Sequence, residues 1–111
     1  MKNKEILKLD ILWALKVKEF GICERCGKNS YLNAHHIYSR SNRAVRWDLN
    51  NGICLCAGCH VLCTDSAHKA PADFIDWVKD YRGAFWWAKL VGLKNTIVKN
   101  QDFETIKKDL E

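Results

Sequence analysis

Two cysteine pairs place the strongest constraint on how this chain folds. Cys23 and Cys26 form one C-x-x-C pair, and Cys56 and Cys59 form a second after residues 27–55. Each pair can present two thiolates from one tight turn, and the four together make the closed tetrahedral ligand set of a structural zinc site. A chain of 111 residues has room for one modest core. We therefore predict a single domain over residues 1–111 with a structural Zn²⁺ that contributes folding free energy directly.

The alternative for these pairs is a set of buried apolar cysteines or a redox couple. Residues 1–20 carry charges throughout, with no long apolar run and no small-residue cleavage site. We therefore expect a cytoplasmic protein, in which thiols stay reduced and clustered cysteines bind metal. Cys54 and Cys63 are expected to be small buried hydrophobic residues, with Cys63 as the reserve ligand if Cys59 does not bind.

The spacing of apolar residues predicts a small α+β domain. Helical periodicity and end signals indicate helices at about 3–19, 71–82 and 101–110, and short apolar runs indicate strands at 31–37 and 52–56. Residues 38–50 are polar and irregular, residues 57–63 suit a helix, and the apolar, aromatic run 84–93 leaves its state open. The order strand, loop, strand, helix is thus framed by the cysteine pairs and flanked by N- and C-terminal helices.

Three of the four histidines fall inside the segment that the cysteines frame. His35 and His36 are adjacent on an expected strand, so their side chains point to opposite sides of it. His60 follows Cys59 directly, so a zinc site would set its direction. A metal held by His35 and His60 keeps open positions for water and phosphate, while His36 could activate a water nearby. A single histidine is more often a surface or hydrogen-bonded residue, but this clustering favours a functional role.

This part of the chain closely resembles the HNH nuclease motif. The resemblance lies in the two cysteine pairs, in Ala34-His-His-Ile37, and in Asn51-Gly-Ile-Cys-Leu-Cys56 through His60. The three letters of the motif correspond to His36, Asn51 and His60. The resemblance implies a ββα-metal (His-Me finger) core over about residues 22–68 and a DNA endonuclease activity. It implies that His36 is the general base. It also implies that Asn51 ties the loop by backbone hydrogen bonds without binding metal.

The same resemblance assigns a catalytic divalent ion to His35 and His60. Imidazole ligands suit transition metals, so we expect Mn²⁺ or another divalent transition metal, such as nickel or cobalt, to serve as well as Mg²⁺. Many relatives carry a further histidine four residues after the last one, where this chain has Thr64. His68 could take its place, although a surface role is favoured for it.

The loop after the first expected strand predicts contacts with DNA. Residues 39–46 include Arg40, Arg43 and Arg46 and no acid, and the whole chain has a net charge of +5. Arginines can grip phosphates in bidentate geometry, but a solvated loop with ordinary charges is an equal alternative. The three tryptophans at 47, 86 and 87 are expected in the core.

A weaker resemblance of the loop to NinG (Rap) recombination proteins suggests a phage origin, with phage packaging or recombination proteins as further partners. Two readings compete with the nuclease: a catalytically silent, zinc-stapled DNA-binding module, and a packaging or recombination accessory protein. The first explains the four cysteines but gives no reason for the order of His35, His36, Asn51 and His60.

Overall fold

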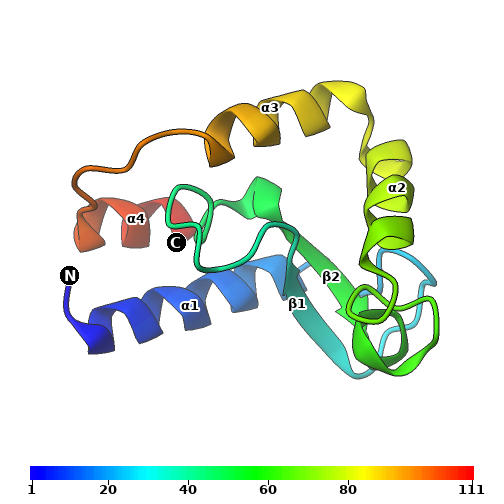
Figure 1. Cartoon of the computed structure of the whole chain (residues 1–111). Coiled ribbons are helices and arrows are strands. Elements are labelled where there is room, and N and C mark those ends of the chain that lie inside the picture. The colour runs from blue at the N-terminus through cyan, green and yellow to red at the C-terminus, as the bar shows by residue number, and fades with distance from the viewer.

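The computed structural model describes all residues, 1–111, as a small α+β domain (Figure 1). Its elements in chain order are α1 (Asn3–Lys18), β1 (Leu32–His36), η1 (Leu49–Asn51), β2 (Gly52–Cys56), η2 (Gly58–Leu62), α2 (Pro71–Arg82), α3 (Ala84–Lys94) and α4 (Phe103–Leu110). The expected helices and strands are all present, with ends displaced by one or two residues. None of the helices has the length and apolar character needed to cross a membrane.

The two strands form an antiparallel sheet in which Leu32 pairs with Cys56 and His36 pairs with Gly52. Successive side chains of a strand alternate between the faces of a sheet. Ile53 and Leu55 accordingly pack on the side of α2, whereas Cys54 packs on the side of α1. The prediction that Cys54 is a small buried residue is confirmed, since its exposure is 0%.

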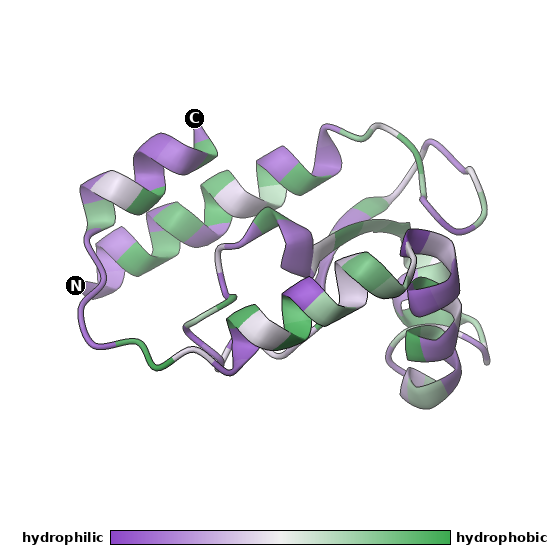
Figure 2. Ribbon diagram, turned by 90° about the horizontal axis from the view of Figure 1, so that it is seen from above, coloured by the Kyte–Doolittle hydropathy of each residue, from purple (hydrophilic) through white to green (hydrophobic).

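Each face of the sheet carries its own apolar cluster. One cluster joins α1 and α4 to the sheet and contains Leu9, Trp13, Val17, Trp47, Cys54 and Leu110. The other joins the sheet to α2 and contains Cys23, Ile53, Leu55, Cys56, Ala67, Phe74 and Val78. Figure 2 shows α1 and α4 side by side, with hydrophobic and hydrophilic residues alternating along both. Only 18 of the 111 residues are buried, so neither cluster is deep. In a core this small, a bound structural metal would add substantially to the free energy of folding.

Helix α3 occupies the run whose state the sequence leaves open. Gly83 separates it from α2, and its φ of +94° is a left-handed value that residues with a side chain rarely adopt. Pro71 opens α2 at the first helical position, which suits its fixed backbone angle. At α4 the Asp102 carboxylate accepts from the Thr105 amide, so Asp102 caps this helix.

The expected helix over 57–63 is a single π-type turn, and this changes the position of Cys63. The turn ends at Leu62, and Cys63 has extended backbone angles, which carry its side chain away from the helical face. Cys63 is exposed, so the prediction that it is buried was wrong. The fourth sulfur beside the other three cysteine ligands belongs to Cys59, and the reserve ligand is not needed.

Candidate metal centres and candidate active site

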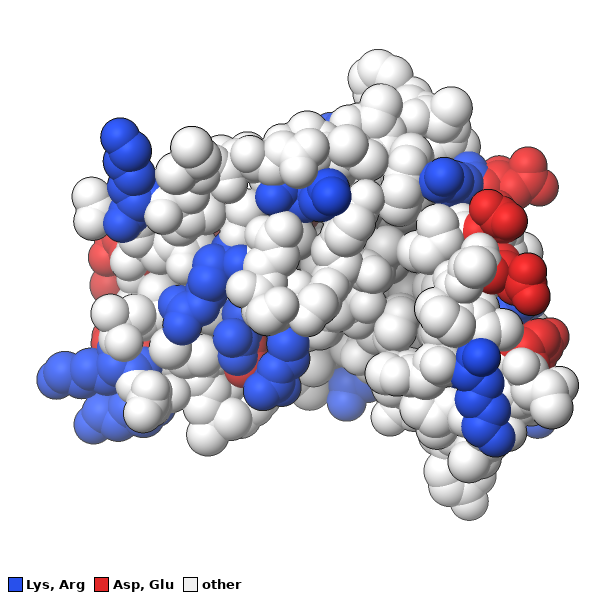
Figure 3. Space-filling view, in the orientation of Figure 1, with Lys and Arg blue, Asp and Glu red and all other residues white.

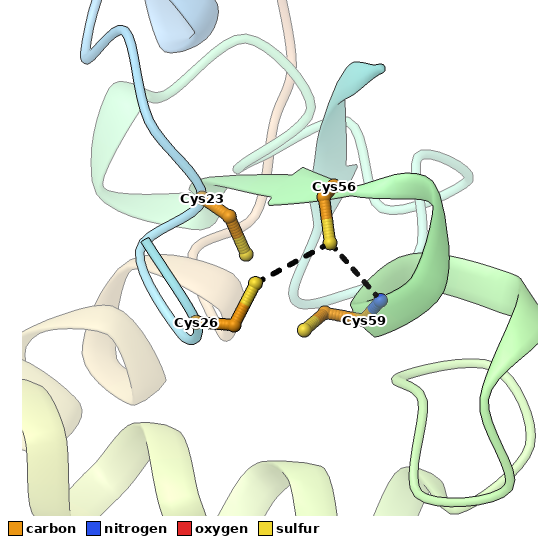
Figure 4. A group of neighbouring side chains, drawn as sticks. All are labelled: Cys23, Cys26, Cys56 and Cys59. Atoms are coloured by element: carbon orange, nitrogen blue, oxygen red, sulfur yellow. Dashed lines mark hydrogen bonds between the residues drawn. The ribbon is translucent and has the colours of Figure 1, made fainter. Parts of the chain in front are cut away.

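The four paired cysteines meet in one cluster, as the spacing predicts. Their sulfur atoms all lie within 4.8 Å of one another. Figure 4 shows them pointing toward a common centre from the turn at residues 22–29 after α1 (the knuckle), from the end of β2 and from η2. The Cys26 and Cys56 sulfurs are 3.6 Å apart. Tetrahedral zinc with bonds of ~2.3 Å to sulfur requires sulfur–sulfur distances of about 3.8 Å. These four cysteines can therefore hold a structural metal ion such as zinc.

Backbone hydrogen bonds shape the first cysteine pair for this task. The Cys23 amide donates to the Lys28 carbonyl at 2.7 Å, and the Gly27 amide donates to the Cys23 carbonyl at 2.9 Å. Burial raises the pKa of Cys23, but hydrogen bonds from the backbone of Cys56, Cys26 and Arg25 outweigh it and lower that pKa to about 6. The pKa of Cys59 is raised by burial and by its crowded sulfur neighbours. A cation at the centre would stabilise the thiolate form of all four.

A buried ion pair ties this knuckle to the rest of the fold. Glu24 lies between the two cysteines of the first pair, and its Oε2 accepts from the Cys54 amide at 2.8 Å. Arg82, at the end of α2, donates to Glu24 Oε1 at 3.1 Å and to the Gly52 carbonyl at 2.8 Å. The Glu24 side chain is only 6% exposed. The knuckle, β2 and α2 are thus joined by one polar network that the sequence pattern did not reveal.

A second candidate metal centre consists of three imidazoles. His35 extends from β1, His60 from η2 and His68 from the segment before α2, and each offers a nitrogen within 4.8 Å of the others. The Nε2 atoms of His60 and His68 are 3.0 Å apart. Nitrogens that share a metal at ~2.0–2.1 Å lie about 2.9–3.3 Å apart, so this spacing suits a shared ion. His68 is exposed, as expected, yet it joins the two histidines that the sequence nominated.

The backbone explains why His68 reaches this place. After η2 the chain turns back on itself, with the Ala67 amide bonded to the Cys59 carbonyl and the His68 amide bonded to the His60 carbonyl. This return brings the His68 side chain beside those of His35 and His60. The sequence named His68 as a possible ligand but favoured a surface role for it, because no local pattern predicts the return.

Burial favours the neutral, metal-binding form of two of these imidazoles, His35 and His60. Burial, followed by the neighbouring His60, His68 and His36, lowers the pKa of His35 to about 3. Burial and the charge of His68 also lower the pKa of His60. The ring of His35 rests against the edge of Phe74, with centroids 5.3 Å apart. The three rings line a pocket of about 600 Å³ between β1 and the start of α2.

His36 points away from His35, as predicted for neighbours on a strand. Its ring stacks on Trp13 of α1 with centroids 3.8 Å apart and planes 8° apart. Its Nε2 lies 2.9 Å from the backbone carbonyl of Arg46. A carbonyl only accepts hydrogen bonds, so in the neutral ring Nε2 carries the proton and Nδ1 carries the free lone pair. Burial lowers the pKa of His36, although the Arg46 carbonyl and Asp10 act in the opposite direction.

Asn51 lies fully buried at the base of the loop between the strands. Its Oδ1 accepts from the Tyr38 amide at 2.7 Å, and its Nδ2 donates to the carbonyls of Tyr38 and Val45 at 3.0 and 3.2 Å. One side chain therefore joins the beginning and the end of the loop. The Arg46 carbonyl that bonds His36 is the next one along the chain from Val45.

The three loop arginines have different environments. Arg46 forms a bidentate pair with Asp10 of α1, through Nε to Oδ1 at 3.0 Å and Nη2 to Oδ2 at 2.8 Å. Its guanidinium is therefore engaged within the protein. Arg40 and Arg43 are exposed and form no ion pair, and Arg40 also lines the histidine pocket. On the face in Figure 3, basic side chains gather over this loop and acidic ones lie at the edge over α2.

Aromatic and basic side chains pair beside the loop in a way that linear sequence hides. Tyr38 stacks with Trp87 of α3 at 5.5 Å, and the Lys94 ammonium lies 4.9 Å from the Tyr38 ring centroid. Trp47 is buried, as expected. Trp87 and its neighbour Trp86 are only partly buried, so they are less enclosed than predicted.

Comparisons with protein-family models, with curated proteins and with solved structures each find no match for this chain. The function must therefore be argued from the chain's own residues and their geometry.

Proposed function

We propose that this chain is an HNH-type endonuclease that hydrolyses phosphodiester bonds in DNA, built on a ββα-metal core that runs from the knuckle to His68. His36 is the general base, and one divalent ion is held by His35, His60 and His68. One observation carries the proposal: His36, whose Nδ1 is free, directly follows His35 on β1, and His35 belongs to the cluster of three imidazoles.

The base needs a lone pair and a fixed orientation, and His36 has both. The Arg46 carbonyl takes the proton-bearing Nε2, so Nδ1 is the atom that accepts a proton from the attacking water. The lowered pKa of His36 keeps the ring neutral near pH 7. A base in this position contributes typically ~10²–10⁴-fold to the rate. Asn51 acts as a positioning residue, since it holds both ends of the loop that supplies the Arg46 carbonyl.

The three imidazoles fit a divalent transition metal better than magnesium alone. They are neutral nitrogen donors from three separate segments, and three protein ligands leave positions open for water and phosphate. When bound, the ion supplies Lewis acidity toward the scissile phosphate and its leaving oxygen. The ligand set predicts activity with Mn²⁺, Ni²⁺ or Co²⁺ as well as Mg²⁺, and the family resemblance predicts products with 3′-hydroxyl and 5′-phosphate ends.

The DNA backbone is the polyanion that suits the charged face beside the pocket. Arg40 borders both the pocket and the loop, and Arg43 lies three residues further on; neither is neutralised by an acid. Contacts of this kind position a duplex without reading its sequence. Because Arg46 is held by Asp10, we assign it to the loop's structure rather than to the DNA.

Plasmid nicking tests the proposal. Wild type, His36→Ala and the control Asn33→Ala, which also shortens a side chain of β1, are compared with EDTA, Mg²⁺ and Mn²⁺. We expect nicking by wild type and Asn33→Ala only with added metal, and a loss of at least ~10²-fold for His36→Ala. Inert wild-type protein that still shifts DNA in a gel would favour the zinc-stapled binding module instead. Undiminished cutting by His36→Ala would remove His36 from the role of base.

The contribution of His68 is tested separately by metal binding. Isothermal titration of Mn²⁺ or Co²⁺ into zinc-loaded protein should give one further ion per chain. His68→Ala should weaken that binding by ~10-fold or more, because a third ligand is lost. The zinc content should stay unchanged. An unchanged affinity in His68→Ala would leave His35 and His60 as the only ligands.

A further inference from the structure

The N-terminal helix lies outside the cysteine-framed segment, yet one of its side chains contacts the proposed base and a second holds the loop residue that bonds it. Asp10 and Trp13 are three residues apart on α1, so they share one face of the helix. Trp13 is 2% exposed and lies flat against the ring of His36, 3.8 Å away between centroids. Nothing in the HNH motif of this sequence includes either residue.

Asp10 acts on the same ring indirectly, through the loop. Its carboxylate accepts two hydrogen bonds from the Arg46 guanidinium and one from Trp47 Nε1 at 2.8 Å. Trp13 Nε1 donates to the Asp48 carbonyl at 3.0 Å. Three consecutive loop residues are thus fastened to α1, and the first of them carries the carbonyl that bonds His36 Nε2.

The close approach of α1 to the sheet is itself built into the sequence. Gly52, which pairs with His36 across the sheet, has no side chain, and a Cβ there would lie 2.5 Å from Val17 Cγ2 and 2.8 Å from Trp13 Cζ2. Any larger residue would push α1 away from the strand. The absence of a side chain at Gly52 therefore allows Trp13 to reach the imidazole.

We propose that α1 is part of the active site, with Trp13 and Asp10 as positioning residues that hold the His36 ring so that Nδ1 is the free nitrogen. The expected effect on turnover rests on the proposed nuclease function. The orientation of the His36 ring, however, can be measured on inactive protein. Stacking fixes the plane of the ring, and the carbonyl held by the Asp10–Arg46 pair fixes its rotation within that plane.

The test compares Trp13→Leu, Trp13→Phe and Asp10→Asn with Leu9→Ala. Leu9 is a fully buried neighbour in the same apolar cluster, so Leu9→Ala loosens the packing of α1 without touching His36. Nicking is measured at saturating metal and over a range of DNA concentrations. Since small displacements of a catalytic group cost up to ~10²-fold, we expect Trp13→Leu to lower kcat by about 10–100-fold with little change in KM. Trp13→Phe should recover most of the rate because it restores a flat ring.

The second readout is the ¹⁵N spectrum of the histidine rings, with His36 assigned by its absence in His36→Ala. Wild type should show a protonated Nε2 and an unprotonated Nδ1 for His36. Trp13→Leu and Asp10→Asn should average the two nitrogens, while Leu9→Ala should not. A wild type that never nicks defeats the nuclease proposal, but the ring spectrum still decides the positioning role. An unaltered His36 spectrum in both α1 variants would overturn it, as would an equal loss of kcat in Leu9→Ala.

Discussion

Replacement of Asn51 by alanine offers the most direct test of how the loop is held. The substitution removes the acceptor of the Tyr38 amide and the donor to the Tyr38 carbonyl, and neither group has another bond within the protein. The Val45 carbonyl loses its bond to Nδ2 but keeps the one from the Asp48 amide. Two backbone groups are therefore left without partners, whereas a third is still satisfied.

The cost follows from these two groups. An orphaned buried backbone group costs ~1–3 kcal/mol, and the lower half of that range applies because Tyr38 is only partly buried and water can reach it. We expect Asn51→Ala to lower the free energy of unfolding by about 2–3 kcal/mol. With an unfolding entropy of ~2.1 cal/mol/K per residue, a chain of this length should lose about 10 °C in Tm.

The assay is urea unfolding of zinc-loaded protein, followed by both circular dichroism and tryptophan fluorescence. Asn50→Ala is the matched control, since the same change one position away removes a side chain that forms no hydrogen bond. If Asn51→Ala is destabilised by no more than ~0.5 kcal/mol beyond Asn50→Ala, the loop does not depend on these bonds and the reasoning fails. Coincident transitions by the two probes are required for this comparison.

Three further predictions concern the metal, the charge and the DNA. Cys26→Ala should lose zinc by elemental analysis and unfold at a lower temperature, whereas Cys54→Ala should keep it, because Cys54 packs in the apolar cluster against α1 and is not one of the four clustered cysteines. The His35 pKa of about 3 in the folded chain lies below the ordinary value, so between these two pKa values the unfolded chain binds more protons. Lowering the pH from 7 to 5 in the absence of divalent ions should therefore reduce the free energy of unfolding by up to ~1.4 kcal/mol per pH unit. Denaturant titrations at each pH should show a smaller loss in His35→Gln. Arg40→Gln with Arg43→Gln should reduce the slope of log Kd against log salt by up to ~2 in fluorescence-anisotropy titrations of duplex DNA, and an unchanged slope would remove both from the interface.

The elements that the sequence predicted are those with a local cause. Helices α1 and α2 follow from apolar periodicity, and α2 also from the proline at its start and the glycine after its end. The cysteine cluster follows from ligand type and spacing within two short turns. Helix α3 resisted prediction because its run is apolar almost all round, so it shows no clear buried face. Its surroundings and the preceding Gly83 decide its state.

What the sequence could not provide is the partner of each side chain across the fold. Arg46 looks like its neighbours Arg40 and Arg43 in the sequence, and only the arrival of Asp10 from α1 separates their roles. His68 likewise depends on a return of the backbone after η2. Cys63 was misplaced because a helix was extended through a turn that ends one residue earlier. The role of Arg46 is thus set by a long-range contact, whereas His68 and Cys63 depend on the path of the backbone around and after η2.

The two candidate metal centres share one short segment, the turn from β2 into η2. Cys56 and Cys59 supply two of the four sulfurs, and His60 follows at once with its ring in the imidazole cluster. The four clustered cysteines join this turn to the knuckle, because two of them lie in each. The three histidines, in contrast, come from three separate segments. Under the proposed function, a structural ion on the four cysteines would fix this turn and so place His60 in advance. That would reduce the entropy lost when an ion binds the three histidines.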